Sequence, residues 1–247
     1  MPRRKAVGGS LPSPKPRQRR RGRGRSTSKR QPQPPRRRTC AADLVRFDRR
    51  ILAGGCQCLA GIDEAGRGAL AGPVVAAAVI LRPRAPFPEL RDSKTLNAKQ
   101  RERLYEELLQ LAECWAVGVV EADAIDAVNI LQATHQAMCC AVRGLELAPD
   151  HLLVDGLPVP SLPIPHTPVV GGDQLSLSVA GASIIAKVER DRIMCALDAL
   201  YPQYGFAQNK GYGTKSHIAA LKAHGISPVH RRSFGPVKLL AQKELEL

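Results

Sequence analysis

The sequence lacks any run of about 20 apolar residues, the length that a membrane-spanning helix needs. Its N-terminus also lacks the apolar stretch of a secretory signal. Both absences argue against insertion into a membrane or secretion. We therefore expect a soluble, cytoplasmic protein without a membrane partner.

Cysteine is present but lacks the pattern of a metal site. The seven cysteines, an odd number, include no pair of Cys-x-x-Cys units, and no histidine lies near them at the spacing of a zinc site. We interpret them as reduced structural thiols.

Acidic residues are missing from residues 1–40, which hold 15 of the 37 lysines and arginines. The rest of the chain holds 22 basic and 22 acidic residues, so the net charge of +15 belongs to this segment alone. The segment has almost no large apolar residue after Leu11 and cannot bury enough surface to offset the entropy of ordering. We expect residues 1–45 to form a disordered basic tail and residues 46–247 to form one catalytic domain.

Two interpretations of the tail remain open. Its arginine clusters can bind nucleic-acid phosphates without sequence specificity, with an affinity that falls as salt rises. Alternatively, it is a solubilising extension or the product of a mis-assigned start site.

Apolar patterning predicts strands and helices in alternation. Runs rich in Val, Ile and Ala predict strands at 59–63, 73–81, 115–121 and 151–155. Helical spacing predicts a helix capped by Asn97, two more at 128–145 and 175–200, and a short one around 218–223. Five prolines favour a rigid loop or short edge strand at 156–172. This order predicts an α/β fold in which helices cover a mixed sheet.

The segment Gly-Ile-Asp-Glu-Ala-Gly-Arg-Gly at 61–68 is the most informative one. Asp63 and Glu64 end a predicted strand, and carboxylate oxygens are the ligands that Mg²⁺ prefers. Gly66 and Gly68 let the backbone approach a ligand closely, while Arg67 offers a planar donor for phosphate or sugar oxygens. The segment therefore indicates a site for a nucleic-acid phosphodiester.

Two further acids, Asp155 at a strand end and Asp191 on the long helix, are expected to join Asp63 and Glu64. Four carboxylates together would repel one another unless divalent cations neutralise them, and two such ions can hold a scissile phosphate. Each acid alone has an ordinary explanation, because Asp191 follows Lys187 by four residues, which suits a helix ion pair. The prediction depends on the combination with the Gly-Arg-Gly turn.

Eight segments between residues 59 and 237 occur in the order of a known family: GIDEAGRGALAGPVVAAAVIL, RDSKTLNAKQRE, NILQATHQAM, LLVDG, ASIIAKVERDRIM, YPQYGF, NKGYGTKSH and HRRSF. In this register they resemble bacterial ribonuclease HII. The resemblance implies a ribonuclease H-like mixed five-stranded sheet flanked by helices, with a helical C-terminal extension. It also implies a monomeric endonuclease that cleaves RNA in RNA/DNA hybrids and incises duplex DNA 5′ of embedded ribonucleotides. The products would carry 3′-hydroxyl and 5′-phosphate ends, and Mg²⁺ or Mn²⁺ would serve a two-metal mechanism.

The resemblance also implies roles for single residues. Four carboxylates would be catalytic and bind metal, namely Asp63, Glu64, Asp155 and Asp191. The substrate would be bound by the turn, by two lysines and by an aromatic that packs against the sugar after the ribonucleotide: Gly66, Arg67, Gly68, Lys94, Lys187 and Tyr212. Arg231 and Arg232 are further candidates for phosphate contacts. The chain departs from the family pattern at Asn209, where histidine is usual, and at Ala69 and Gly181.

Two competing hypotheses belong to other classes. In one, the protein only binds nucleic acid, mainly through its tail, and its carboxylates are dispensable. In the other, it is another nuclease of the same fold, such as a junction resolvase. The Gly-Arg-Gly turn argues against the second, because such substrates offer no 2′-hydroxyl to read.

Overall fold

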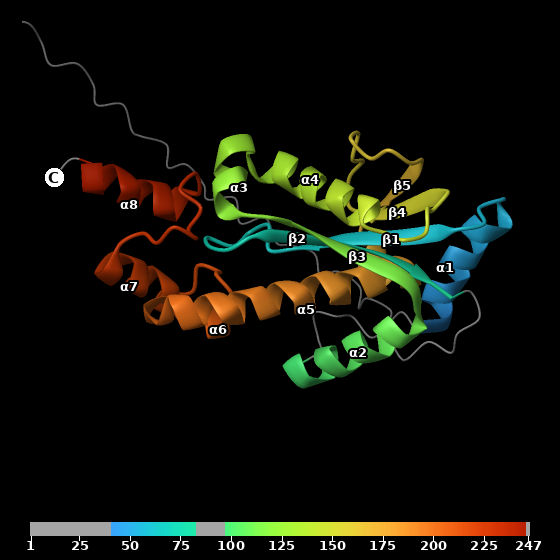
Figure 1. Ribbon diagram of the computed structural model, residues 1–247, viewed down its shortest axis with the longest axis horizontal. Coiled ribbons are helices and arrows are strands. Elements are labelled where there is room, and N and C mark those ends of the chain that lie inside the picture. The colour runs from blue at the N-terminus through green and yellow to red at the C-terminus, as the bar shows by residue number, and fades with distance from the viewer. Residues whose placement is uncertain (1–40, 83–96, 246–247) are drawn as a thin grey trace, which may run out of the picture. The chain divides into compact units, whose positions relative to one another are not determined.

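The computed structural model describes residues 41–82 and 97–245, and the side chains of 44–82 and 97–242 (Figure 1). Its strands are β1 (Leu59–Ala65), β2 (Val74–Leu81), β3 (Ala112–Val120), β4 (His151–Asp155) and β5 (His166–Val169). Its helices are α1 (Ala41–Ala53), α2 (Ala98–Leu111), α3 (Ala122–Val128), α4 (Ile130–Arg143), α5 (Leu177–Leu200), α6 (Phe206–Asn209), α7 (Lys215–His224) and α8 (Gly235–Leu245). Two short 3₁₀ turns are η2 (Gly172–Gln174) and η3 (Pro202–Tyr204).

The strands form one mixed sheet in the order β3-β2-β1-β4-β5. β1, β2 and β3 pair antiparallel, while β1 pairs parallel with β4, and β4 with β5. The predicted five-stranded mixed sheet is therefore confirmed. The proline-rich segment supplies β5 at the edge, which is where a strand tolerates Pro168 because the outer side needs no amide donor.

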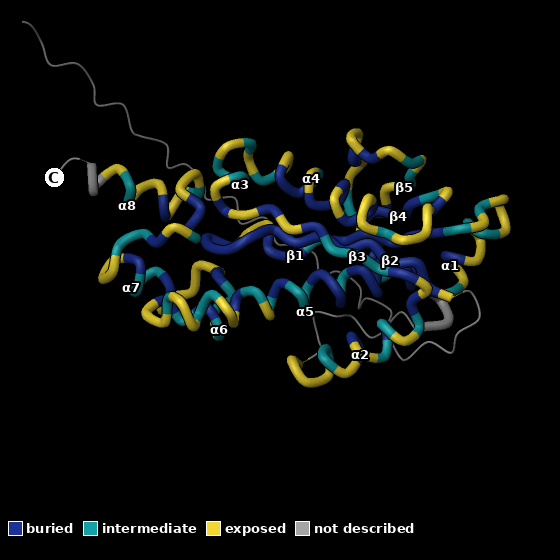
Figure 2. Tube along the Cα trace, viewed as in Figure 1, coloured by how far each residue is buried: buried dark blue, intermediate teal, exposed yellow. Residues whose placement is uncertain are grey.

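Helices cover both faces of the sheet (Figure 1). α4 packs on one face against Ile62 and Val154, and α5 packs on the other against Ala77 and Val79, with α2 beside it. β2 contributes to both clusters and is buried along its whole length, as Figure 2 shows for the centre of the sheet. This two-sided burial explains why β2 reads as a continuous apolar run.

The local expectations for helices hold with two differences. Asn97 caps α2 in a capping box with Gln100, as predicted. The helix expected at 128–145 is α4, which begins at Ile130 because Asn129, with a φ of 73°, caps it, and a separate helix that was not expected, α3, precedes it. α1 was not expected and begins at Ala41, inside the segment assigned to the tail.

The C-terminal helices form a small subdomain with its own apolar cluster. Tyr204, Phe206, Leu221 and Val237 pack there against Leu70, which follows the Gly-Arg-Gly turn. The predicted helical extension is therefore present and joined to that turn. Among the residues whose structure is described, no helix combines the length and apolarity needed to cross a membrane.

Candidate active site

Asp63 and Asp155 lie side by side on the face of the sheet that α5 covers. The parallel register pairs Ile62 with Val154, so the next residue of each strand is one of these two acids. Neighbouring strands lie about 4.8 Å apart, and paired residues point to the same face. Asp63 is only 6 % exposed. The fold therefore brings together two carboxylates that are 92 residues apart in sequence.

The pKa of Asp63 is raised well above its ordinary value. Burial is the largest cause, and the negative charges of Glu64 and Asp155 add to it. A hydrogen bond with Ser183 of α5 and one from the Glu64 amide, at 2.6 Å, oppose the shift. The charged form of Asp63 is thus disfavoured until a positive charge comes near.

Glu64 shares this environment. Burial raises the pKa of its carboxyl, the Arg67 guanidinium lowers it, and Asp155 raises it again. Arg67 Nη1 donates to Glu64 Oε1 at 3.0 Å, while 51 % of the Arg67 side chain stays exposed. The turn therefore places a half-exposed cation at the edge of the carboxylate group.

Asp173 is a buried acid close to this group that was not among the predicted site residues. It lies in η2, directly after the edge strand β5, and is 7 % exposed. The amide of the preceding residue, Gly172, donates to Asp155 Oδ1 at 2.7 Å. Like Asp155, it follows apolar residues, here Val169 and Val170, but two glycines intervene and the prolines before that pair obscured the strand.

The structure does not bring Asp191 into this group. Asp191 forms an ion pair with Lys187 one turn earlier on α5, and Arg101 Nη1 of α2 lies 3.7 Å from its Oδ2. α2 packs with α5 on the β2–β3 side of β1, whereas Asp155 lies on β4. The local ion pair left open as an alternative is what the structure contains.

The donor set fits a divalent cation by its chemistry. Hard carboxylate oxygens are concentrated where burial and mutual repulsion raise the pKa of Asp63 and Glu64, and a cation would relieve both effects. Within the described part of the chain, no three His, Cys, Asp or Glu side chains already converge closely enough to hold an ion. Rotation of side chains such as Glu64, which now contacts Arg67, would be needed to close the shell.

Gly66 and Gly68 differ in what a side chain at each position would contact. Gly66 has a φ of 93°, and a Cβ there would lie 1.9 Å from Nε of the buried Arg190. A Cβ on Gly68 would meet no protein atom within 4 Å. Gly66 is therefore required by the fold, whereas Gly68 leaves open backbone for a ligand to approach.

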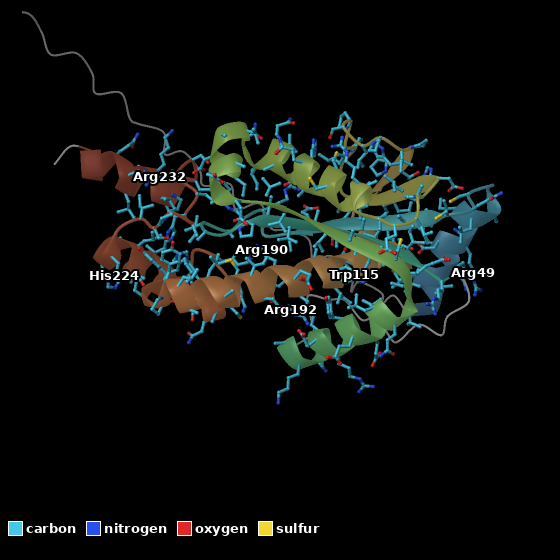
Figure 3. All side chains as sticks on the ribbon, viewed as in Figure 1. Arg49, Trp115, Arg190, Arg192, His224 and Arg232 are labelled. Carbon is cyan, nitrogen blue, oxygen red and sulfur yellow. The ribbon has the colours of Figure 1, made fainter. Side chains whose placement is uncertain are left out.

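Two buried arginines hold the backbone behind the turn. Arg190 of α5 donates to the carbonyls of Ala71, Pro73 and Lys210 at 3.0 to 3.2 Å, and it lies between α5 and the sheet (Figure 3). Arg231 donates to the carbonyls of Gly72 and Arg67 at 2.9 and 3.0 Å. Both are fully buried. Arg231 thus anchors the turn and cannot meet a phosphate at the surface.

Tyr212 lies next to the same turn. Its side chain is 39 % exposed, and Arg190 Cζ lies 5.5 Å from the centre of its ring. Residues 210–214, between α6 and α7, form the loop that carries Tyr212, called the tyrosine loop below. The Leu70 amide donates to the Gly211 carbonyl at 2.8 Å and joins this loop to the turn. Asn209, where the family pattern has histidine, bonds the Gly211 amide and the Tyr204 carbonyl, so it stabilises this loop.

Three candidates for substrate contacts remain, namely Lys94, Lys187 and Arg232. Lys94 lies outside the described residues. Lys187 is held by Asp191, and burial lowers its pKa. Arg232 is exposed, and its amide donates to Asp126 Oδ2 at 2.6 Å.

Comparisons with known proteins agree with this geometry. The family model described as ribonuclease HII matches residues 60–237. A ribonuclease HII of Desulfitobacterium hafniense is 53 % identical over 195 residues, which cover 79 % of this chain and 75 % of the relative. One from Geobacillus thermodenitrificans is 52 % identical over 196 residues, with the same shares of 79 % and 75 %.

Solved structures show the same fold. The ribonuclease H2 of Pyrococcus horikoshii superposes with a TM-score of 0.65 at 24 % identity, covering 77 % of this chain and all of that one. A chain of the PCNA:RNase HII complex of Archaeoglobus fulgidus gives 0.60 at 28 % identity, over 72 % and 95 % of the two chains. The sheet and flanking helices are therefore those of a ribonuclease H-like fold.

Proposed function

The chain belongs to the ribonuclease HII family of hydrolases that cleave RNA in RNA/DNA hybrids, and we propose that it also incises duplex DNA on the 5′ side of embedded ribonucleotides. The products would carry a 3′-hydroxyl and a 5′-phosphate. The observation that carries the proposal is the carboxylate group at one edge of the sheet, within reach of the Gly-Arg-Gly turn.

Asp63, Glu64 and Asp155 are the proposed catalytic residues and metal ligands. Asp173 is buried next to Gly172, whose amide donates to Asp155, and this supports it as the fourth, whereas the ion pair of Asp191 with Lys187 supports a structural role. When bound, one or two Mg²⁺ or Mn²⁺ ions would neutralise these acids, activate the attacking water and stabilise the leaving oxygen.

The protein's own residues would bind and orient the sugar and phosphate. The open backbone at Gly68 supports close approach to a 2′-hydroxyl, because no protein atom would meet a Cβ there. Arg67 is half-exposed beside Glu64 and would contact a phosphate oxygen. The exposed ring of Tyr212 would pack against the next sugar, where a deoxyribose fits better than a ribose.

The test is cleavage of a duplex that carries one ribonucleotide, with Mg²⁺ and with Mn²⁺, by the parent and by Asp63→Asn. We expect the parent to cut once, 5′ of the ribonucleotide, and the variant to bind the duplex without cutting it. A parent that binds the duplex and leaves it intact with both metals would refute the proposal. Deletion of residues 1–40 serves as a control. If this deletion abolished all activity on the duplex while Asp63→Asn left that activity unchanged, the protein would be a nucleic-acid binding protein that works through its tail.

A further inference from the structure

A buried hydrogen-bonded chain of two histidines ends on the backbone of Tyr212. His217 Nδ1 lies 2.9 Å from the Tyr212 carbonyl, and its Nε2 lies 3.0 Å from His230 Nε2. The Nδ1 of His230 lies 3.1 Å from the Ser227 amide nitrogen and 2.7 Å from the Ser227 hydroxyl. His217 and His230 are 0 % and 1 % exposed. The chain thus connects the loop before α8 to the tyrosine loop.

The direction of every hydrogen bond in this chain follows from one donor. A backbone amide can only donate, so His230 Nδ1 accepts from Ser227 and carries no proton. A neutral His230 must then carry its proton on Nε2 and donate to His217 Nε2. His217 in turn carries its proton on Nδ1 and donates to the Tyr212 carbonyl. Only this pair of tautomers satisfies all the contacts.

The surroundings keep both rings neutral. Tyr204 and Phe206 pack on them, with 4.7 Å between the ring centres of Tyr204 and His230 and 5.5 Å between those of Phe206 and His217. Burial lowers the pKa of His217, and burial together with the neighbouring ring lowers that of His230 to about 4. At neutral pH the tautomer order is therefore fixed.

The backbone of Tyr212 is held at three points. Its amide donates to the Asn209 carbonyl at 2.9 Å, and its carbonyl accepts from the Thr214 amide at 2.7 Å as well as from His217. His217 is the one side chain among these donors to the carbonyl, and it is the one that a substitution can remove without changing the turn itself. Its ring therefore helps to hold the backbone from which the Tyr212 side chain extends.

We propose that His217 is a positioning residue for recognition of the RNA-to-DNA junction, acting through the Tyr212 carbonyl, with His230 and Ser227 fixing its tautomer. The inference rests on the proposed function, in which Tyr212 packs against the sugar after the ribonucleotide. A loosened carbonyl lets the tyrosine ring leave the position in which it distinguishes deoxyribose from ribose. Junction incision then slows more than cleavage of a continuous RNA/DNA hybrid, where every step presents a ribose.

The first experiment assigns the tautomers by ¹⁵N NMR of the imidazole rings in the full chain at pH 7. We expect His217 neutral with its proton on Nδ1, the less common tautomer, and His230 neutral with its proton on Nε2. A charged His217, or one protonated on Nε2, would overturn the proposal without any enzymatic assay.

The second experiment measures kcat and KM on an embedded ribonucleotide and on a hybrid for His217→Phe and His217→Asn. His217→Phe removes the hydrogen bond to the Tyr212 carbonyl as well as the one from His230, and loss of the former should lower kcat on the junction about tenfold with little change in KM, so that the ratio of junction to hybrid rates falls. His217→Asn should restore most of that ratio, because its amide N–H can still donate to the carbonyl. His151→Asn, which removes a half-buried histidine on β4, is the matched control and should leave the ratio at the parental value.

Different results would refute the proposed function and the positioning role. A parent that leaves the embedded ribonucleotide intact would refute the proposed function, and the positioning role with it. A parent that incises normally while His217→Phe lowers both rates equally would refute the positioning role alone.

Discussion

Replacing Asp63 by asparagine should stabilise the fold while it abolishes cleavage. Asp63 is 6 % exposed and lies beside Asp155 on the adjacent strand. If Asp63 is ionised, two unit charges about 5 Å apart repel by about 3 kcal/mol at an effective dielectric constant of about 20, and if its raised pKa keeps it protonated at pH 7, folding carries the free energy of taking up that proton. Asparagine removes this repulsion and keeps an oxygen that can accept from the Glu64 amide. We expect a gain of about 1–3 kcal/mol, which raises Tm by about 2–10 °C in a domain of this size.

The assay is thermal and urea unfolding of parent and variant at pH 7 with a chelator, repeated with millimolar Mn²⁺. The cation should raise the Tm of the parent and reduce or remove the advantage of Asp63→Asn, because a bound cation already offsets the repulsion. Asp123→Asn, at an exposed acid in the first turn of α3, is the control and should change stability by less than about 0.5 kcal/mol. A parental Tm that equals or exceeds that of Asp63→Asn in the chelator would refute the charge argument.

Three further predictions follow from single positions. Gly66→Ala should unfold or inactivate the protein because its Cβ would meet Arg190, whereas Gly68→Ala should keep the parental Tm and lose cleavage; equal Tm losses would contradict this. Gly181→Ala should raise stability by about 0.5–1 kcal/mol in urea unfolding, since a Cβ there meets side chains only at 3.5 Å or beyond in ordinary contact; a loss would show that α5 has no room. The pKa of His230 is lowered to about 4 from 6.5, so the stability present above pH 6.5 should fall by about 3 kcal/mol as the pH drops to about 4, and His230→Gln should show a shallower fall in a pH series of urea unfolding.

The sequence indicates most of the sheet and three of the four carboxylates proposed for the site. Asp63 and Asp155 could be predicted because each follows an apolar run in the sequence. That local pattern does not depend on which strands pair. The helix cap at Asn97 could also be predicted, because the capping box involves only Gln100, three residues later in the sequence.

The rest depends on pairing that no local pattern encodes. Asp173 comes near Asp155 because β5 pairs parallel with β4 at the edge, although the five prolines of residues 156–172 suggested little regular structure. Asp191 looked equally suitable, but its ion pairs with Lys187 and with Arg101 of another helix become visible only in three dimensions. His217 lies in α7 and His230 in the turn-rich segment after it, and nothing in either sequence indicates that their rings meet.

The most direct test of the account compares three single substitutions in the embedded-ribonucleotide assay with Mg²⁺ and Mn²⁺. Asp63→Asn and Asp173→Asn should abolish incision, while Asp191→Asn, which loses the ion pairs with Lys187 and Arg101, should retain most of it. Incision that survives in Asp173→Asn and is abolished in Asp191→Asn, with both variants folded, would contradict the carboxylate group at the β1–β4–β5 edge as the catalytic centre.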